Sequence, residues 1–173
     1  MTGYIVFSGA IMISILSKFI SWLGQTVAWF NPLMATLIVV VVVLRYLFDT
    51  GSLLLQESVI YLHGAVVMLG ISYALQNKSH VRVDIVFSRW SKTTQATVDL
   101  VGHLIFLMPF SLCVLIFSWE YVLASWQIRE GSLEVGGIQA VFVLKTLIPA
   151  MSITLLIQGL AESVKCVRII RGD

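Results

Sequence analysis

The chain has 173 residues, of which 58% are hydrophobic and only 12% are charged. Ordinary soluble domains contain about 45–50% apolar residues and about 25% charged residues, so this composition excludes a water-soluble globular domain and predicts an integral membrane protein. The net charge of +2 is too small for the basic surface of a nucleic-acid-binding protein, so no nucleic-acid partner is expected.

The first 21 residues are expected to form an amphipathic lead-in helix. Polar side chains recur every three or four positions in this part of the chain, at Ser14, Ser17, Lys18, Ser21 and Gln25. This spacing places them along one side of a helix. We expect the helix to lie at the cytoplasmic interface or to continue into the first span. The alternatives are a separate fifth crossing and a cleaved signal peptide, and the second is disfavoured because no Lys or Arg precedes the apolar run.

Four segments have the length and apolar character to cross the hydrocarbon core, which takes about 20 helical residues. They cover about residues 22–48, 57–76, 97–120 and 138–164. Pro32, Pro109 and Pro149 lie in three of them, and each proline can kink its helix. The sequence therefore predicts an all-α integral membrane protein, with one membrane domain over residues 1–173 and four transmembrane helices.

The distribution of Lys and Arg predicts the orientation, because cytoplasmic loops carry the excess of these residues. Eight of the eleven fall on one face: Lys18, Lys78, Arg82, Arg89, Lys92, Lys165, Arg168 and Arg171. Both termini are therefore expected in the cytoplasm.

The pentapeptide His80-Val81-Arg82-Val83-Asp84 places three ionisable side chains between two long apolar segments. In an extended backbone, alternate side chains point to the same side, so His80, Arg82 and Asp84 would share one face. We expect them to contact lipid headgroups or a partner subunit at the membrane face. A purely solvated loop is the alternative.

Charged residues at membrane depth are costly, and each needs a partner or a route to water. Arg45 ends the first span and Glu57 opens the second, so an ion pair across the short connection is expected to close this hairpin. The alternatives are a local pair with Asp49, one helical turn from Arg45, an Arg45 side chain that extends to the interface, and a direct role in transport. Lys145 lies near the start of the fourth span, where its long stem can reach the outer interface or meet Glu120, Glu130 or Glu134.

Enzymatic chemistry has no recognisable motif in this sequence. The chain lacks a glycine-rich phosphate loop, zinc-ligand spacing, and a nucleophile with its base, and Cys113 and Cys166 lie at depths too different for a disulfide. His63 and His103 suggest a rival function as haem ligands between neighbouring spans. The two histidines differ in depth by about 10 Å if each span is about 30 Å long, which disfavours a shared haem.

An ordered set of short motifs runs along nearly the whole chain after residue 20. It consists of Arg45-Tyr46 with Phe48, Leu55-Gln56-Glu57, residues 70–75, His80-Val81-Arg82-Val83-Asp84, Ser125-Trp126, Glu130-Gly131-Ser132, Gly136-Gly137, and Lys145 with Pro149. In this order and spacing, the set resembles the small membrane subunit of tripartite ATP-independent periplasmic (TRAP) transporters, the DctQ-like family. Many family members open the second span with a Trp and two adjacent acids, whereas this chain has only Glu57 there. The resemblance therefore does not identify the transported solute.

The resemblance implies a sodium-coupled, binding-protein-dependent secondary transporter of an organic acid in the bacterial inner membrane. Its partners would be a large elevator-type permease subunit, which this chain braces, a periplasmic solute-binding protein and membrane lipids. Sodium and the solute would bind to the large subunit, so no cofactor is expected here. Glu130 and Glu134 would be available to contact the binding protein, with ordinary solvated charges as the alternative. The rival classes are a haem-binding redox subunit and an assembly subunit unrelated to transport.

Overall fold

A computed structural model describes residues 2–79 and 87–172, with side chains from residue 14 onward. The elements are α1 (Thr2–Ala28), α2 (Phe30–Leu47), α3 (Leu53–Gln76), α5 (Lys92–Gly102), the π-helical turn η1 (His103–Leu107), α6 (Met108–Gln127) and α7 (Val141–Arg171). Four stretches within this part of the chain are long and apolar enough to span a membrane: Ser14–Leu47, Leu53–Gln76, Lys92–Gln127 and Val141–Arg171. The predicted all-α, four-span fold is therefore confirmed. His80, Arg82 and Asp84 lie outside the described residues.

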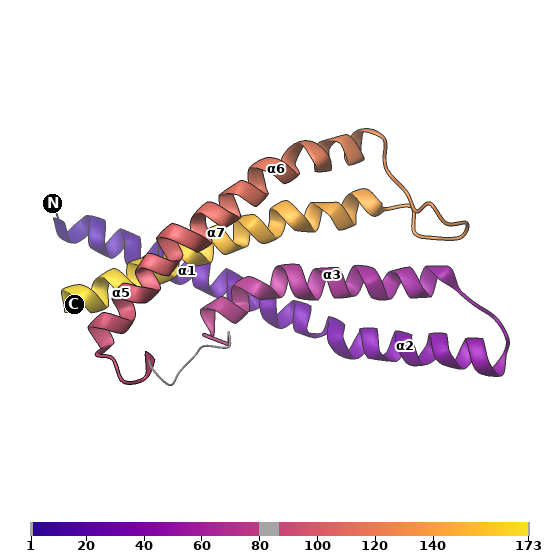
Figure 1. The fold of residues 1–173 in the computed structure, drawn as a ribbon, viewed down its shortest axis with the longest axis horizontal. Helices are drawn as coiled ribbons and strands as arrows, with labels where there is room; N and C mark the ends of the chain where they lie inside the picture. The colour runs from indigo at the N-terminus through magenta and orange to yellow at the C-terminus, as the bar shows by residue number, and fades with distance from the viewer. Residues whose placement is uncertain (1, 80–86, 173) are drawn as a thin grey trace.

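The helices form two hairpins (Figure 1). Residues 48–52 join α2 to α3, and residues 128–140 join α6 to α7. Both connections lie at one end of the molecule, which we call the hairpin end, and both chain termini lie at the other, the terminal end (Figure 1). The two termini thus share one end, while the side of the membrane that they face stays a prediction.

The helices are arranged as a row and do not close into a bundle. α7 packs against α6 on one side and α3 on the other, and α2 packs against α3 beyond it (Figure 1). Among the described helices, no comparable contact joins α2 to α6 at the two edges of the row. The apolar side chains of these edge helices are consequently open: Val39 in α2 is 60% exposed and Phe117 in α6 is 81% exposed.

The central helix α7 contains more buried residues than any other described helix. Its buried residues are Pro149, Ser152, Thr154, Leu155, Gln158, Gly159, Ala161, Glu162, Ser163 and Cys166. Most of these are small or polar, and such residues let helix backbones approach closely where lipid removes the hydrophobic drive for association. The Ser72 hydroxyl of α3 donates to Thr154 Oγ1 at 2.9 Å, and this buried hydrogen bond joins the two hairpins directly.

The α6 face that packs on α7 is formed by serines at seven-residue intervals. Ser111, Ser118 and Ser125 are all buried on the same side of α6. A seven-residue interval returns to nearly the same side of an α-helix after two turns, so one stripe of small side chains faces α7. The Ser111 hydroxyl donates to the carbonyl of Leu107, one turn earlier in η1, at 2.8 Å. This bond satisfies the hydroxyl, which finds no hydrogen-bond acceptor in the lipid chains.

Two of the three prolines lie close to irregular turns, whereas Pro149 lies inside the uninterrupted helix α7. η1 ends two residues before Pro109, and the Met108 N–H donates to the carbonyl of His103, five residues back. Proline lacks an N–H and crowds the preceding turn, so the wider π turn accommodates it. α1 ends at Ala28 and α2 starts at Phe30, so the break at Trp29 comes shortly before Pro32.

α1 runs without interruption through the point where the lead-in was expected to end. The helix covers Thr2–Ala28, and the candidate span Ser14–Leu47 runs through it into α2, which fits the expectation that the lead-in continues into the first span. Part of the polar side of α1 packs on protein, since Ser21 Oγ donates to Gln76 Oε1 at 3.1 Å and Gln76 Nε2 donates to the Ser17 carbonyl at 3.0 Å. These bonds fasten α1 to the end of α3.

Gly24 determines how closely α1 approaches α3. A Cβ atom at this position would lie 2.2 Å from Tyr73 Cγ, whereas a Cβ atom at Gly70 of α3 would meet nothing within 4 Å. We expect Gly24→Ala to lower the free energy of unfolding in detergent by about 1–3 kcal/mol through overpacking. The matched control Gly70→Ala should leave it unchanged or raise it by about 0.5–1 kcal/mol, because alanine favours the helix. Equal effects of the two substitutions would contradict the close α1–α3 contact.

Candidate functional site

Glu57, near the start of α3, binds the connection between α6 and α7. Its carboxylate accepts hydrogen bonds from Ser132 Oγ at 2.5 Å and from the backbone N–H of Ile138 at 2.5 Å. The approach is close enough that a Cβ atom at Gly137 would lie 2.7 Å from Glu57 Oε1. Both carboxylate oxygens are therefore occupied by donors of the other hairpin, and Glu57 joins the two hairpins at the hairpin end.

The predicted ion pair between Arg45 and Glu57 is wrong. No ion pair joins these two described residues, because Glu57 lies on the side of α3 that faces residues 128–140 and not α2. Arg45 is exposed in the last turn of α2, where a cation is favourable next to the helix C-terminus. This placement fits the alternative in which the Arg45 side chain extends to the interface; the local pair with Asp49 is also not formed.

Lys145 and Glu130 form the second polar contact of this end. Lys145 Nζ lies 2.5 Å from Glu130 Oε2, which also accepts from Ser125 Oγ at 2.6 Å. The same ammonium lies 4.1 Å from the ring centroid of Tyr121, within the range of a cation–π contact. Of the two predicted alternatives for Lys145, the outer interface or one of three acids, the structure shows the contact with Glu130, and the pair joins the start of α7 to the connection after α6.

Aromatic side chains add to the contact between α6 and α7 at this end. The Trp126 indole N–H donates to Thr146 Oγ1 at 2.9 Å, and its ring meets Phe142 edge to face with centroids 4.6 Å apart. An indole with an apolar body and one polar donor suits the boundary between hydrocarbon and headgroups. The hydrogen bond and the ring contact both join α6 to α7, beside the Lys145–Glu130 pair.

The backbone between α6 and α7 places these groups. At the end of α6, Arg129 has φ 46°, and the Glu130 N–H donates to the Ser125 carbonyl at 3.0 Å while the Arg129 N–H donates to the Trp126 carbonyl at 3.2 Å. This pair of bonds is the Schellman arrangement, in which a left-handed residue ends the helix. Gly136, with φ 86°, then turns the chain back, and the Gly137 N–H donates to the Glu134 carbonyl at 3.2 Å. These turns bring Glu130 to Lys145 and Ser132 to Glu57.

Glu134 lies at the exposed tip of the same connection and has no ion-pair partner among the described residues. It stands between Leu133 and Val135, whose side chains are 101% and 99% exposed. The two candidate contact residues thus differ, because Glu130 is engaged within the protein and Glu134 is available. Sequence reasoning missed Ser132 and the N–H of Ile138; the Gly136-Gly137 pair was the only sign that the backbone approaches another group closely here.

The two histidines of the rival haem hypothesis are not brought together. His63 is exposed on α3, whereas His103 of η1 lines a cavity at the terminal end to which His63 does not contribute. Among the described residues, no three His, Cys, Asp or Glu side chains cluster as metal ligands would. The geometry does not favour a shared haem between α3 and η1.

The Glu130 contact predicts a pH dependence of the hairpin end. The hydrogen bond from Lys145, followed by that from Ser125, lowers the pKa of Glu130 below its ordinary value of 4.5. A lowered pKa in the folded state means that the contact contributes fully above pH 4.5 and is lost as the pH falls through the folded pKa. We expect acidification below this range to lower the thermal unfolding midpoint of the wild-type chain.

The matched variants are Glu130→Gln and Glu134→Gln, two acids of one connection. Glu130→Gln should lower the midpoint at neutral pH and lose part of the acid-induced decrease, and Glu134→Gln should leave both unchanged. Identical pH profiles of the two variants would show that the Lys145–Glu130 contact does not stabilise the fold.

A comparison with protein-family models places this geometry in a known family. A model described as the DctQ component of tripartite ATP-independent periplasmic transporters matches residues 34–169, which include α3, α5, η1, α6 and most of α2 and α7. No curated protein sequence matches the chain. The matched segment contains Glu57, Glu130 and Lys145 and covers most of the sequence. The chain therefore belongs to the family of DctQ components of tripartite ATP-independent periplasmic transporters, a family of membrane transporter components and not of enzymes.

Proposed function

We propose that this chain is the small permease subunit of a sodium-coupled, binding-protein-dependent secondary transporter for an organic acid in the bacterial inner membrane. It braces the large elevator-type permease subunit and carries no solute site of its own. Sodium binds to the large subunit, and the solute arrives on a periplasmic binding protein. Membership of the DctQ family supports the assembly.

The observation that carries the bracing role is the open row of helices. A closed bundle buries its apolar side chains internally, whereas a row leaves two broad faces and two edges for lipid and protein contacts. Phe106 is 72% exposed in η1, Phe110 is 58% exposed in α6 and Val42 is 47% exposed in α2. A flat layer of this kind suits a subunit that lies along the side of a larger membrane protein and widens it in the bilayer.

The polar interior of the row also supports a structural role. Thr154 of α7 is hydrogen-bonded to Ser72 inside a helix contact, and Ser152 donates to the Ile148 carbonyl of its own helix at 3.1 Å. In carriers, by contrast, unsatisfied backbone and polar side chains near the middle of the membrane line a solute cavity. These hydrogen bonds hold the helices together, while among the described residues the buried Ser17 Oγ, Tyr61 Oη and Gln158 Oε1 have no hydrogen-bond partner.

The contacts of the hairpin end make the brace resistant to deformation. Glu57 links α3 to the α6–α7 connection, and the Lys145–Glu130 pair links α7 to the end of α6. The three helices α3, α6 and α7 are thereby fixed relative to one another at this end. An elevator-type partner needs such a fixed support, against which its mobile part can slide.

The charge distribution supports an orientation with the hairpin end in the periplasm. Glu134, Leu133 and Val135 then form an exposed tip that faces the binding protein, and Glu134 is the acid available for this contact. In this orientation we expect His80, Arg82 and Asp84, which lie outside the described residues, to contact headgroups or the large subunit on the cytoplasmic side.

Co-purification of this chain with the large subunit tests the proposal. Arg82→Ala or Asp84→Ala should reduce recovery of the two-subunit complex, while the affinity of the binding protein for its solute stays the same. In proteoliposomes, uptake should require both membrane subunits, the binding protein and an inward sodium gradient. Glu120→Gln, which changes a charge elsewhere on the chain, is the matched control for recovery.

Two results would contradict the proposal. One is full recovery of the complex together with a changed affinity of the binding protein, and the other is uptake that persists without this chain. Absorption by bound haem in the purified chain would instead favour the redox rival.

A further inference from the structure

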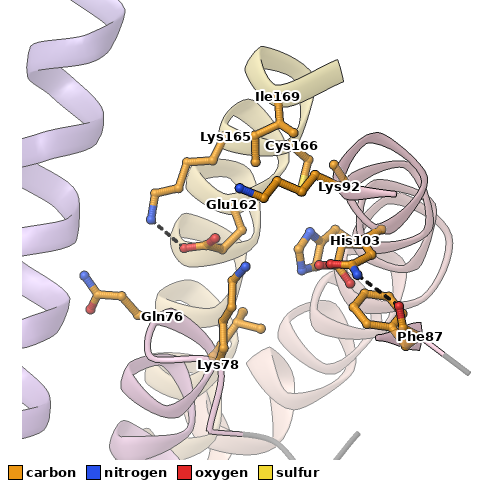
Figure 2. A pocket seen from close by; sticks show the side chains of 13 residues that line it. Gln76, Lys78, Phe87, Lys92, His103, Glu162, Lys165, Cys166 and Ile169 are labelled. Atoms are coloured by element: carbon orange, nitrogen blue, oxygen red, sulfur yellow. Dashed lines mark hydrogen bonds and ion pairs between the residues drawn. The ribbon is translucent and has the colours of Figure 1, made fainter. Parts of the chain in front are cut away.

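A cavity of about 530 Å³ opens at the terminal end, between the end of α3, α5 and α7 (Figure 2). Leu75, Ala96 and Ile169 form part of its apolar wall. Its polar lining includes Lys78, Lys92 and Lys165, each from a different part of the chain. A cavity that combines an apolar wall with several cations differs from the plain helix surfaces of the rest of the row.

The positions of the three lysines in the fold follow from the local backbone. Lys78, with φ 52°, ends α3 in a Schellman arrangement, where its N–H donates to the Leu75 carbonyl at 3.2 Å. Lys92 is the first residue of α5, directly after the N-cap Ser91. Lys165 projects from α7, and Figure 2 shows all three side chains extending toward the carboxylate of Glu162.

The described residues that line the cavity carry more positive than negative charge. Glu162 is almost fully buried, and its Oε1 atom already accepts from Lys165 Nζ at 2.7 Å and from Gln158 Nε2 at 2.8 Å. Lys78 and Lys92 form no ion pair with any described residue. Among the described residues that line the cavity there are thus three lysines and two acids, Glu162 and Asp99, and the ammonium groups of Lys78 and Lys92 remain available for an anion.

The depth of the cavity matches that of lipid headgroups. Residues 100–119, between Asp99 and Glu120, contain no Asp, Glu, Lys or Arg. As a helix this stretch is about 30 Å long, which equals the thickness of the hydrocarbon core. Asp99 thus marks one edge of the hydrocarbon, and the cavity that it lines with Lys92 opens at the level of lipid phosphates.

We propose that this cavity binds an anionic phospholipid, with Lys78 and Lys92 donating to the phosphate and the acyl chains lying along Leu75 and Ile169. Ammonium groups bind phosphate oxygens through charge-assisted hydrogen bonds, and anionic lipids concentrate cations at the membrane surface. Free phosphate has the same oxygens, but it uses neither the apolar wall nor the position at the hydrocarbon edge. The bound lipid joins α3, α5 and α7 at the terminal end, as Glu57 and Glu130 join helices at the hairpin end.

Thermal unfolding of the delipidated full chain in detergent tests the site. Phosphatidylglycerol should raise the unfolding midpoint in a saturable manner, and phosphatidylcholine and inorganic phosphate should have little effect at the same concentration. The Lys78→Gln/Lys92→Gln variant should bind phosphatidylglycerol about tenfold more weakly or worse, since two charge-assisted bonds are lost. Circular dichroism of the lipid-free variant checks that its helix content is retained.

The matched control is the Lys18→Gln/Arg171→Gln variant, which loses the same charge at the terminal end from exposed positions outside the cavity. It should bind phosphatidylglycerol as the wild-type chain does. If both double variants bound phosphatidylglycerol equally weakly, the loss of net charge alone would explain the effect, and the proposed site would be overturned. Equal protection by inorganic phosphate, or by phosphatidylcholine, would overturn the assignment to an anionic lipid.

Discussion

Close contact along the small and polar face of α7 is the constraint on which the rest of this structure depends. Lipid is as apolar as the side chains of the helices, so burial in hydrocarbon does not drive them together, and packing and hydrogen bonds must do so. Gly159 and Ser152 of α7 are buried at these contacts, and Ser72 of α3 and Ser111 of α6 face α7 from either side. Because α7 offers such surfaces to two neighbours, the helices line up on both sides of it. The remaining helix faces are left apolar and open.

The two ends of the row are held by different chemistry. At the hairpin end, Glu57 accepts hydrogen bonds from Ser132 and from the backbone N–H of Ile138, and Glu130 is paired with Lys145. At the terminal end, Lys78 and Lys92 line a cavity, and neither lysine forms an ion pair with a described residue. Glu57 and Glu130 thus find their partners inside the protein, whereas the lysines of the terminal end are suited to an anion from the membrane. A brace for a larger subunit needs both ends fixed.

Hydropathy was sufficient to predict the spans and the fold class, because a run of about 20 apolar residues is long enough to cross the hydrocarbon core as a helix. For Lys145 the sequence predicted only that its long side chain reaches the interface or one of three acids, and it did not single out Glu130. The Arg45–Glu57 pair failed because closeness in sequence does not determine which side of α3 Glu57 occupies. The partners of Glu57 include the backbone N–H of Ile138. Every residue except proline has a backbone N–H, so the residue type does not indicate which one will be the donor. The arrangement of the helices in a row could not be predicted from the sequence. Nearly every face of these helices is apolar, so the hydrophobic pattern does not indicate which face packs on protein and which faces lipid.

Disulfide cross-linking in native membranes tests the row most directly. In a chain with Cys113→Ser and Cys166→Ser, the pair Ser72→Cys/Thr154→Cys should form a disulfide efficiently, because the two hydroxyl oxygens lie 2.9 Å apart. The pair Val39→Cys/Phe117→Cys, near the middle of the edge helices α2 and α6, should form none within one chain. An intramolecular disulfide between α2 and α6, with none between α3 and α7, would show that the helices close into a bundle and would contradict the account.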